Sequence, residues 1–438
     1  MTVAPAHSHD CCSHEIPSAG EVAKRDDIFK PEAQETIKAT IEAHRADLIG
    51  ISEYLNANPE LAWKEVKSHA KLVSYLEHQG FEVTGYPEYP TAFRAAYTHG
   101  AGGRVFGLNS EYDALPGIGH ACGHNLIAIC GVGALLGIRA AMKAHDIDGT
   151  VVLIGTPAEE GAAGKVKLLE AGAYDDLGAC MMLHPGRGPG DASGGAVVRS
   201  LAIQHIKVEY FGKPAHAGLA PWEGVNALDA AVMAYSSIGV MRQQIKPESR
   251  IQGVITEGGG HAANVIPAHT ELNYLIRAPT ALDLALVRDK MLGCFEGAAT
   301  VTGCTVTTEL GPEMTELRNE KTLATEYAHV MGQLWHIPVQ VALGESMGAS
   351  TDFGNVTHYM PACHPMYGIP APGGNHTPEF TAAAVTPRAH DESIKAMTAM
   401  ACVGLRYLAD REFALNVADG FKDVKKELAA EQAAAGKV

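Results

Sequence analysis

Three short apolar segments of this chain each run directly into side chains that can bind metals or transfer protons. The segments are RVFGLNSEYD (104–113), TVVLIGTPAEE (150–160) and LGACMMLHP (177–185). The reactive side chains at their ends are Glu111, Asp113, Glu159, Glu160 and His184. Open α/β sheets place their sites at the carboxyl ends of strands, so we predict that the three segments are strands whose ends share one site.

Helical and strand patterns alternate through the rest of the chain. Apolar residues recur at helical spacing from Ile37 through Ile41, Leu48, Ile51 and Leu55. The segment 125–145, NLIAICGVGALLGIRAAMKAH, is predicted to be a largely buried helix. This alternation predicts an α/β fold, and 438 residues with 46% apolar content are enough for two or more domains.

Composition excludes several classes of partner. The formal charge of −16 argues against a general nucleic-acid or anionic-membrane partner, and an acidic substrate would need a local basic pocket. The first fifteen residues, MTVAPAHSHDCCSHE, lack the apolar core of a signal peptide, and no uninterrupted apolar run is long enough to span a membrane. Nine scattered cysteines fit reduced thiols. We therefore expect a cytoplasmic protein.

The segment GIGHACGHN (117–125) packs Cys122 and His124 among glycines. By itself it fits a metal site, a thiol nucleophile with its base, or a glycine-rich helix entry. Together with the carboxylates and His184 it offers the borderline ligands that suit zinc, manganese or cobalt. In the Glu159–Glu160 pair, one side chain can bind a metal while its neighbour acts as a general base. The combination favours a metal site.

The amino-terminal segment HSHDCCSHE also has metal-ligand types, namely His7, His9, Cys11, Cys12 and His14. It lies in a stretch that we predict to be a disordered tail, where such residues are usually not a built site. We therefore do not include this segment in the predicted metal centre.

The motifs NSEYDALPGIGHACGHNLIA, GTPAEEG, LHP, GKPAHAGLAPWEGVNAL, ANVIP and GGNHTPEF follow one another between residues 35 and 410. Together they resemble the dimetal amidohydrolases of the aminoacylase and zinc carboxypeptidase family. The likeness is to the branch with a cysteine ligand, which includes aminobenzoyl-glutamate hydrolases, amino-acid-conjugate hydrolases and aminoacylase-like dipeptidases.

The resemblance implies an α/β architecture in which a mixed-sheet metallopeptidase catalytic domain is interrupted by a smaller α/β lid and dimerisation domain. The implied parts are a disordered tail (1–34), a catalytic domain (35–200 and 312–438) and a lid (201–311). Within the lid, IQHIKVEYF alternates like a strand. A helical stripe follows Pro221 and consists of Val225, Leu228, Val232 and Tyr235.

The same resemblance assigns a role to each site residue. Cys122 would bridge two divalent metals, and Glu159 would be the general base. The remaining implied metal ligands are His124, Glu160, His184 and His376. Spacing alone does not choose His376 over His358 or His364. Many relatives have aspartate after CGH where this chain has Asn125, which changes the charge beside the ligands.

Three implied site residues fall in the lid. His216 would reach the site of a neighbouring subunit and stabilise the tetrahedral oxyanion, which implies a homodimer. Asn264 and Arg277 resemble positions that hold the carboxylate end of the substrate.

The implied activity is hydrolysis of the amide bond of small dipeptides or N-acyl amino acids, releasing a free amino acid. A metal-bound water would attack the carbonyl while Glu159 takes its proton. The branch covers both β-alanyl dipeptides with basic residues and aryl-acyl glutamates, and the sequence does not decide between them. Nor does it choose among zinc, manganese and cobalt.

Three other interpretations stay open on the sequence. GESMG (344–348) matches the nucleophile motif of serine hydrolases, with Ser346 followed by Asp352 and then His364 or His376. Cys122 with His120 or His124 could be a thiol nucleophile and base, but this leaves the glutamate pair unused. A non-catalytic metal- or partner-binding protein would not need Glu159 beside the ligands.

Overall fold

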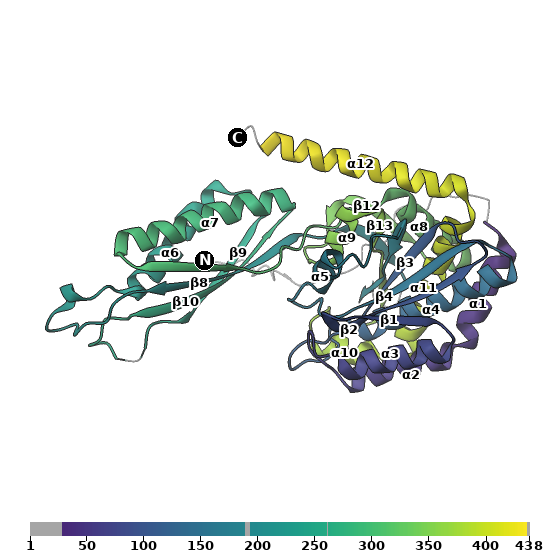
Figure 1. The fold of residues 1–438 in the computed structure, drawn as a ribbon, viewed down its shortest axis with the longest axis horizontal. Helices are drawn as coiled ribbons and strands as arrows, with labels where there is room; N and C mark the ends of the chain where they lie inside the picture. Colours follow the sequence, from purple (N-terminus) through teal and green to yellow (C-terminus); the bar gives the residue numbers. More distant parts are fainter. Residues whose placement is uncertain (1–28, 189–192, 261, 436–438) are drawn as a thin grey trace, which may run out of the picture. The chain divides into compact units, whose positions relative to one another are not determined.

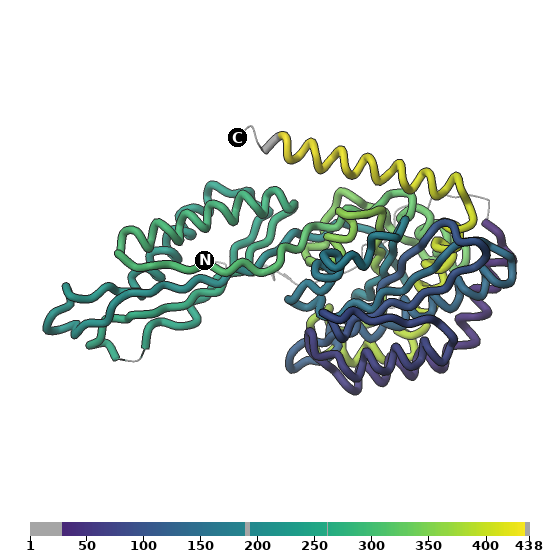
Figure 2. The backbone as a smooth tube through the Cα atoms, in the orientation of Figure 1, coloured from purple at the N-terminus to yellow at the C-terminus, as the bar shows by residue number. Residues whose placement is uncertain are grey.

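The computed structural model describes residues 29–188, 193–260 and 262–435, which form two compact units (Figures 1 and 2). The first unit consists of the described residues of Met1–Arg199, Arg318–Met347 and Val356–Lys425. The second consists of those of Ser200–Leu317, Gly348–Asn355 and Lys426–Val438. The chain thus leaves the first unit after Arg199 and returns to it at Arg318, as the teal and green parts of the tube show (Figure 2).

A six-stranded mixed sheet forms the base of the first unit, in the order β1-β2-β4-β3-β5-β13. Its strands are β1 (Glu82–Tyr86), β2 (Tyr89–His99), β3 (Val105–Glu111), β4 (Gly149–Thr156), β5 (Ala179–Met181) and β13 (Ala362–Cys363). The three segments predicted from the sequence are β3, β4 and β5, which are parallel neighbours. Their carboxyl ends therefore meet at one edge of the sheet, as predicted, and the α/β class with mixed sheets is confirmed.

Helix α4 (His124–Ala144) is the core of the first unit and confirms the helix predicted for 125–145. It packs against β3 and β4, and helices α1, α2 and α11 pack against it (Figure 1). By length and mean hydropathy α4 resembles a membrane-spanning helix, the one such helix among the described residues. Because 89% of its apolar window is buried in the structure, it is explained as the core helix of this unit.

The single helical stripe predicted from Ile37 to Leu55 is divided between two helices, α1 (Pro31–Ala43) and α2 (Arg45–Ala57). The chain turns at His44, so both helices bury their apolar residues against α4. Helix α1 begins inside the predicted tail (1–34), because proline suits the first helical turn and Ala33 is buried. Residues 1–28, including the histidines and cysteines of the tail, lie outside the described residues.

A second sheet of the first unit has the order β12-β7-β14-β6. Its strands are β6 (His184–Arg187), β7 (Gly195–Arg199), β12 (Val339–Ser346) and β14 (Met366–Ile369). The remaining helices that begin in this unit are α3 (Val66–His78), α5 (Gly164–Glu170), α8 (Lys321–Trp335), α10 (Pro378–Ala383), α11 (Pro387–Ala409) and α12 (Arg411–Ala435). Helix α9 (Phe353–Tyr359) begins in the second unit and ends in the first.

The second unit is an antiparallel sheet in the order β11-β8-β10-β9, covered on one face by two helices (Figure 1). The elements are β8 (Ala202–Phe211), β9 (Arg250–Glu257), β10 (His269–Ala278), β11 (Thr305–Leu310), α6 (Ala227–Met241) and α7 (Ala281–Thr302), with short 3-10 turns η1 (Pro221–Glu223) and η2 (Arg242–Gln244).

The predicted strand and the predicted helix after Pro221 are both present. The predicted stripe is not the buried face of α6, because Val232 and Tyr235 are exposed. The buried face of α6 consists of four alanines, which allow close packing on the sheet, together with Ile238 and Met241.

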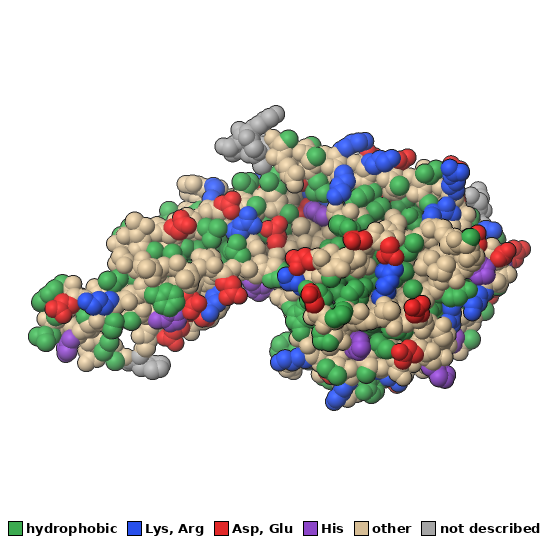
Figure 3. Space-filling view, in the orientation of Figure 1, with side chains coloured by type: hydrophobic (Ala, Val, Ile, Leu, Met, Phe, Trp, Pro, Cys, Tyr) green, Lys and Arg blue, Asp and Glu red, His purple; other side chains and the backbone are tan. Residues whose placement is uncertain are grey.

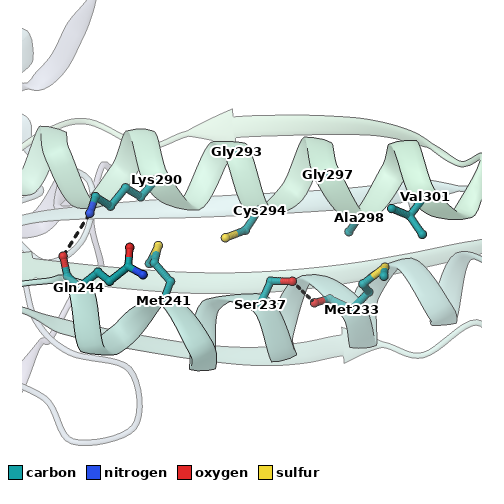
Figure 4. A pocket seen from close by; sticks show the side chains of 10 residues that line it. All are labelled: Met233, Ser237, Met241, Gln244, Lys290, Gly293, Cys294, Gly297, Ala298 and Val301. Atoms are coloured by element: carbon teal, nitrogen blue, oxygen red, sulfur yellow. Dashed lines mark hydrogen bonds between the residues drawn. The ribbon is translucent and has the colours of Figure 1, made fainter.

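A cavity of about 430 Å³ lies between α6 and α7 within the second unit (Figure 4). The Cys294 side chain points into it, and Lys290 closes one end by donating a hydrogen bond to the carbonyl of Gln244. None of the predicted site residues lines this cavity. Over the face of the molecule shown in Figure 3, acidic and basic side chains intermingle.

Close packing of α4 on the sheet yields a stability prediction. A Cβ at Gly131 would meet Ser110, the Leu153 side chain at 2.7 Å and the Asn109 carbonyl oxygen at 2.8 Å. We expect Gly131→Ala to destabilise the protein by about 1–3 kcal/mol, because the backbone oxygen cannot move away. Gly50→Ala is the matched control: Gly50 lies in α2, and a Cβ there would have open space around it, so alanine should stabilise by up to about 1 kcal/mol. Opposite shifts of the thermal unfolding midpoint are expected, and equal shifts would contradict this account.

Candidate functional site

The structure brings the five predicted metal ligands together at the strand-end edge of the first unit. Their positions are Cys122 before α4, His124 as its first residue, Glu160 after β4, His184 as the first residue of β6, and His376 before α10. Ligand atoms of Cys122, His124 and His184 lie within 4.8 Å of one another, and so do those of Cys122, Glu160 and His376. A third such group consists of His124, Glu159 and Glu160. Cys122 is therefore common to two donor groups.

Asp113 orients two of these ligands at once. Its Oδ1 lies 3.0 Å from Nδ1 of His124, and its Oδ2 accepts the backbone N–H of Glu160 at 2.9 Å. Asp113 is fully buried, and burial alone would favour its neutral form. The neighbouring His124 reverses this effect, so the pKa of Asp113 is lowered. The ionised carboxylate turns Nε2 of His124 toward the site.

Gly123 allows Cys122 and His124 to point into one site. Its φ is +83°, in the left-handed region that glycine adopts without strain. A Cβ at this position would lie 2.6 Å from the Pro185 ring and 3.1 Å from Phe380. The spacing Cys-Gly-His therefore reflects both the backbone turn and the close packing around it.

The loop that carries His376 is fixed to the other ligand segments. The His376 backbone N–H donates to the carbonyl of Ala121 at 2.8 Å. The side chain of Asn375 donates to the carbonyls of Cys122 and Pro185, at 3.2 and 3.1 Å. His376 itself has φ +67°, which is uncommon for a residue other than glycine. These hydrogen bonds fix the positions of three ligand-bearing segments that are distant in sequence.

The electrostatics of the site favour positive charge among the donors. Burial opposes ionisation of the Cys122 thiol, but the imidazoles of His184 and His124 outweigh it and lower the pKa of Cys122 well below its usual value. Hydrogen bonding to Cys122 and Glu160 raises the pKa of His376 to about 10. Burial lowers the pKa of His124, yet Glu111 and Asp113 raise it well above its usual value. A thiolate and carboxylates that draw protons onto imidazoles also attract metal cations.

The donor set fits a pair of divalent metals. Nε2 of His124 is buried and makes no hydrogen bond, although Oε2 of Glu111 lies 3.3 Å away, and Oε1 of Glu160 faces Nε2 of His376 at 3.3 Å. Nδ1 of His184 is engaged by the carbonyl of Pro185 at 2.8 Å, which leaves Nε2 facing Sγ of Cys122 at 3.4 Å. Buried donor atoms without partners are costly unless an ion satisfies them.

Two buried residues that support the site were missed from the sequence. Lys165 in α5 is fully buried and pairs with Glu111, whose Oε2 lies 3.3 Å from Nε2 of His124. Glu65, at the start of α3, accepts a hydrogen bond from the backbone N–H of Ala158. Neither residue lies in a pattern that marks it, because each reaches the site through tertiary packing.

The side chain of Asn125 hydrogen-bonds to groups that are not part of the donor set. Its side-chain amide donates to the Ser52 hydroxyl at 2.8 Å and to the carbonyl of Ala384 at 3.0 Å. A carboxylate could donate neither bond. The charges beside His124 are those of Glu111 and Asp113, and the neutral residue at 125 leaves both in place.

The three predicted residues of the second unit do not lie together. His216 and Asn264 are neighbours, since Ala217 N–H donates to the Asn264 carbonyl and His216 pairs with Val265. Both lie beyond the Phe211–His269 end of the β8–β10 ladder, whereas Arg277 pairs with Ile203 at its other end. Eight residues of strand, or roughly 26 Å, separate the two ends. Asn264 and Arg277 therefore do not lie together within a single chain, and their role toward the substrate carboxylate stays a prediction.

The serine interpretation lacks its structural context. Ser346 is the last residue of β12, and the next helix begins only at Phe353, whereas a nucleophile elbow needs a helix directly after the strand. The thiol interpretation is no better supported. Of its two candidate bases, His120 is weak, because burial lowers its pKa to about 4. His124 is held by Asp113 and belongs to two donor groups, so a thiol mechanism would leave the glutamate pair unused.

Sulfur, nitrogen and oxygen donors gathered at one sheet edge of an α/β unit define a candidate metal centre. The chain belongs to Peptidase family M20/M25/M40, whose sequence model matches residues 107–402. It is therefore a hydrolase of amide bonds.

Among curated relatives, the chain is 38% identical to Xaa-Arg dipeptidase of Mus musculus over 394 residues, which cover 86% of this chain and 89% of the relative. It is 33% identical to a p-aminobenzoyl-glutamate hydrolase subunit of Escherichia coli over 289 residues, 62% of this chain and 59% of that one. Among solved structures, a dinuclear metal-binding M20 peptidase of Bacillus subtilis has a similar fold, with TM-score 0.62 and 21% identity over 84% of this chain and 99% of that chain.

Replacing Cys122, the donor shared by two groups, tests the proposed metal centre. We expect Cys122→Ala to lose at least one metal ion per chain, because two donor groups depend on its sulfur. Elemental analysis of the purified protein measures this, with Cys402→Ala as the control, since Cys402 is buried in α11 among the described residues and belongs to neither donor group. A Cys122→Ala protein with the full metal content of the wild type would contradict the assignment.

Proposed function

We propose that this enzyme hydrolyses dipeptides that carry a free carboxyl terminus and a basic carboxyl-terminal residue, using two divalent metal ions. The observation that carries the proposal is the pair of donor groups that share Cys122, with Glu159 beside them. Zinc is favoured by the thiolate donor, with manganese or cobalt as alternatives. The proposed ligands are Cys122, His124, Glu160, His184 and His376.

When bound, the two ions would polarise the scissile carbonyl and acidify the attacking water. The work of the protein is to place its own groups around that reaction. Asp113 holds His124 and Glu160 in position, and the loop of Asn375 holds His376. Preorganised donors of this kind need no rearrangement during the reaction.

Glu159 is the proposed general base. Its Oε2 lies 3.9 Å from Nε2 of His124, and the side chain is largely buried at the donor cluster. The proposed ligand set takes Glu160 of the pair, and it leaves Glu159 to take a proton from the attacking water. The same carboxyl group then delivers that proton to the leaving amine.

Arg277 is the proposed partner of the substrate carboxylate. One guanidinium nitrogen donates to the Ser350 hydroxyl at 3.0 Å, which fixes the planar group while its other donors remain for a ligand. Burial lowers the pKa of Arg277, but a guanidinium stays charged at neutral pH. Such a fork suits a free carboxylate.

Two observations support a basic residue in the substrate. The relative named Xaa-Arg dipeptidase is similar over most of both chains, whereas the p-aminobenzoyl-glutamate hydrolase of Escherichia coli is similar over a shorter part. The chain also has 50 acidic and 34 basic residues, and an excess of negative charge attracts cationic ligands. Aryl-acyl glutamates are the second candidate class.

A homodimer is part of the proposal. Nδ1 of His216 accepts the backbone N–H groups of Gly218 and Leu219, both at 3.2 Å. The ring proton is therefore assigned to Nε2, which makes the exposed end of the imidazole a donor suited to an oxyanion. Since His216 and Arg277 lie at opposite ends of one sheet, a substrate that meets both would take them from two chains.

A substrate panel tests the proposed specificity. Dipeptides ending in arginine, lysine or glutamate and N-acyl amino acids are assayed with zinc, manganese or cobalt, each beside its carboxyl-amidated form. We expect the basic dipeptides to have the highest kcat/KM, and amidation to lower it at least about tenfold, or 1.4 kcal/mol of transition-state binding. Higher kcat/KM for glutamate compounds would favour the second class. Equal values for free and amidated forms would refute carboxylate recognition.

The general base and the dimer can be tested together. Glu159→Gln should keep its metals but lose at least about a hundredfold in kcat, the lower end of general-base contributions. His216→Ala should also be impaired while retaining metal.

Mixing the two inactive proteins should then restore activity. In a mixed dimer, the site that keeps Glu159 would receive an intact His216 from the other chain, so one site of two is complete. Verified heterodimers with no recovery would show that His216 acts within its own chain or not at all. Normal turnover by fully metallated Glu159→Gln would exclude Glu159 as the base.

A further inference from the structure

Glu65 is a buried carboxylate bonded to the backbone just before the proposed general base. It precedes helix α3, and its side chain is fully buried. Its Oε1 accepts the N–H of Ala158 at 2.9 Å and the N–H of Trp63 at 2.9 Å. Ala158 lies 93 residues from Glu65 in the chain, so this is a tertiary contact and not a local turn.

Both backbone groups that Glu65 holds are in an unfavourable conformation. Ala158 has φ +62° and Trp63 has φ +64°, in the left-handed region that residues with a side chain rarely adopt. Such a conformation persists only where the surroundings hold it in place. A hydrogen bond to a buried carboxylate is among the stronger ones available for that purpose.

The turn after β4 is therefore held by two carboxylates. Glu65 binds the N–H of Ala158, and Asp113 binds the N–H of Glu160 at 2.9 Å. The carbonyl of Ala158 also accepts the N–H of Gly164 at 3.0 Å, which closes the loop. Glu159 lies between the two fixed amides, so the direction of its side chain depends on both.

We propose that Glu65 is a positioning residue that directs Glu159 by holding Ala158 in the left-handed conformation. This role rests on the proposed function, in which Glu159 is the general base. It depends on the reach of the Glu65 side chain and on its acceptor oxygen.

A purely electrostatic role for Glu65 makes a different prediction. Burial, together with the nearby charge of Asp113, raises the pKa of Glu65 to about 7. If the charge of Glu65 mattered most, removing that charge would do more harm than shortening the side chain. Two substitutions separate these explanations.

The test compares Glu65→Asp with Glu65→Gln in the full-length, zinc-loaded enzyme. Glu65→Asp keeps the charge but withdraws the acceptor, and it should lower kcat at least tenfold with KM within threefold and metal content unchanged. Glu65→Gln keeps an oxygen acceptor at the same reach, so its kcat should stay within threefold of the wild type. The reverse order of effects would overturn the proposal.

A rescue experiment tests the connection through Ala158. Glycine adopts the left-handed conformation without a Cβ penalty, so adding Ala158→Gly to Glu65→Asp should raise kcat at least threefold. Ala163→Gly is the matched control, because Ala163 has φ +52° in the same loop but does not take part in the Glu65 contacts described above. Equal effects of the two glycine substitutions would overturn the proposal.

Further outcomes separate this inference from the proposed function. If Glu159→Gln is fully active with its metals bound, the proposed base is wrong; if it is inactive while Glu65→Asp behaves as wild type, only the positioning role is wrong. Should Glu65→Asp not fold, Ala158→Val disfavours the same backbone conformation from the other side of the contact. It should lower kcat at least tenfold with full metal content, and an unchanged kcat would overturn the proposal.

Discussion

The interaction on which the site depends is the contact of one buried carboxylate, Asp113, with two ligand-bearing segments. Asp113 follows β3 and meets the first residue of α4, His124, and the backbone of Glu160 after β4. Because β3 and β4 are parallel neighbours, the ends of both strands and the start of the core helix lie at one point. Packing that fixes α4 on the sheet therefore also fixes the metal donors, and stability and chemistry are coupled in this unit.

Much of this arrangement follows from the sequence. Short apolar runs bounded by polar residues predicted β3, β4 and β5, and acidic or imidazole side chains at their ends predicted a common site. These inferences succeed because they use local pattern and the geometry of parallel sheets. Local patterns could not identify His376 as a ligand, because its loop reaches Cys122 through a contact between residues 253 apart in the chain. Only the resemblance to a family distinguished it from the other histidines.

Other features could not be inferred, because tertiary packing decides them. Helix α6 buries four alanines along with Ile238 and Met241 but exposes Val232 and Tyr235, since small residues approach the sheet more closely. Glu65 looks like an ordinary charged residue at the start of a helix, and only the fold shows it bonded to Ala158. The separation of His216 from Arg277 likewise follows from strand register, which the sequence leaves undetermined.

The interrupted layout of the first unit has a consequence for biosynthesis. Cys122, His124 and His184 precede the main segment of the second unit, Ser200–Leu317, in the chain, whereas His376 follows that segment. At about 5–20 residues per second, a ribosome needs roughly 10–40 s to extend the chain from His184 to His376. The donors of one group thus exist on the growing chain well before the other group has its histidine. The second donor group therefore becomes complete only after Ser200–Leu317 of the second unit has been synthesised, whereas the donors of the first group are all made before it.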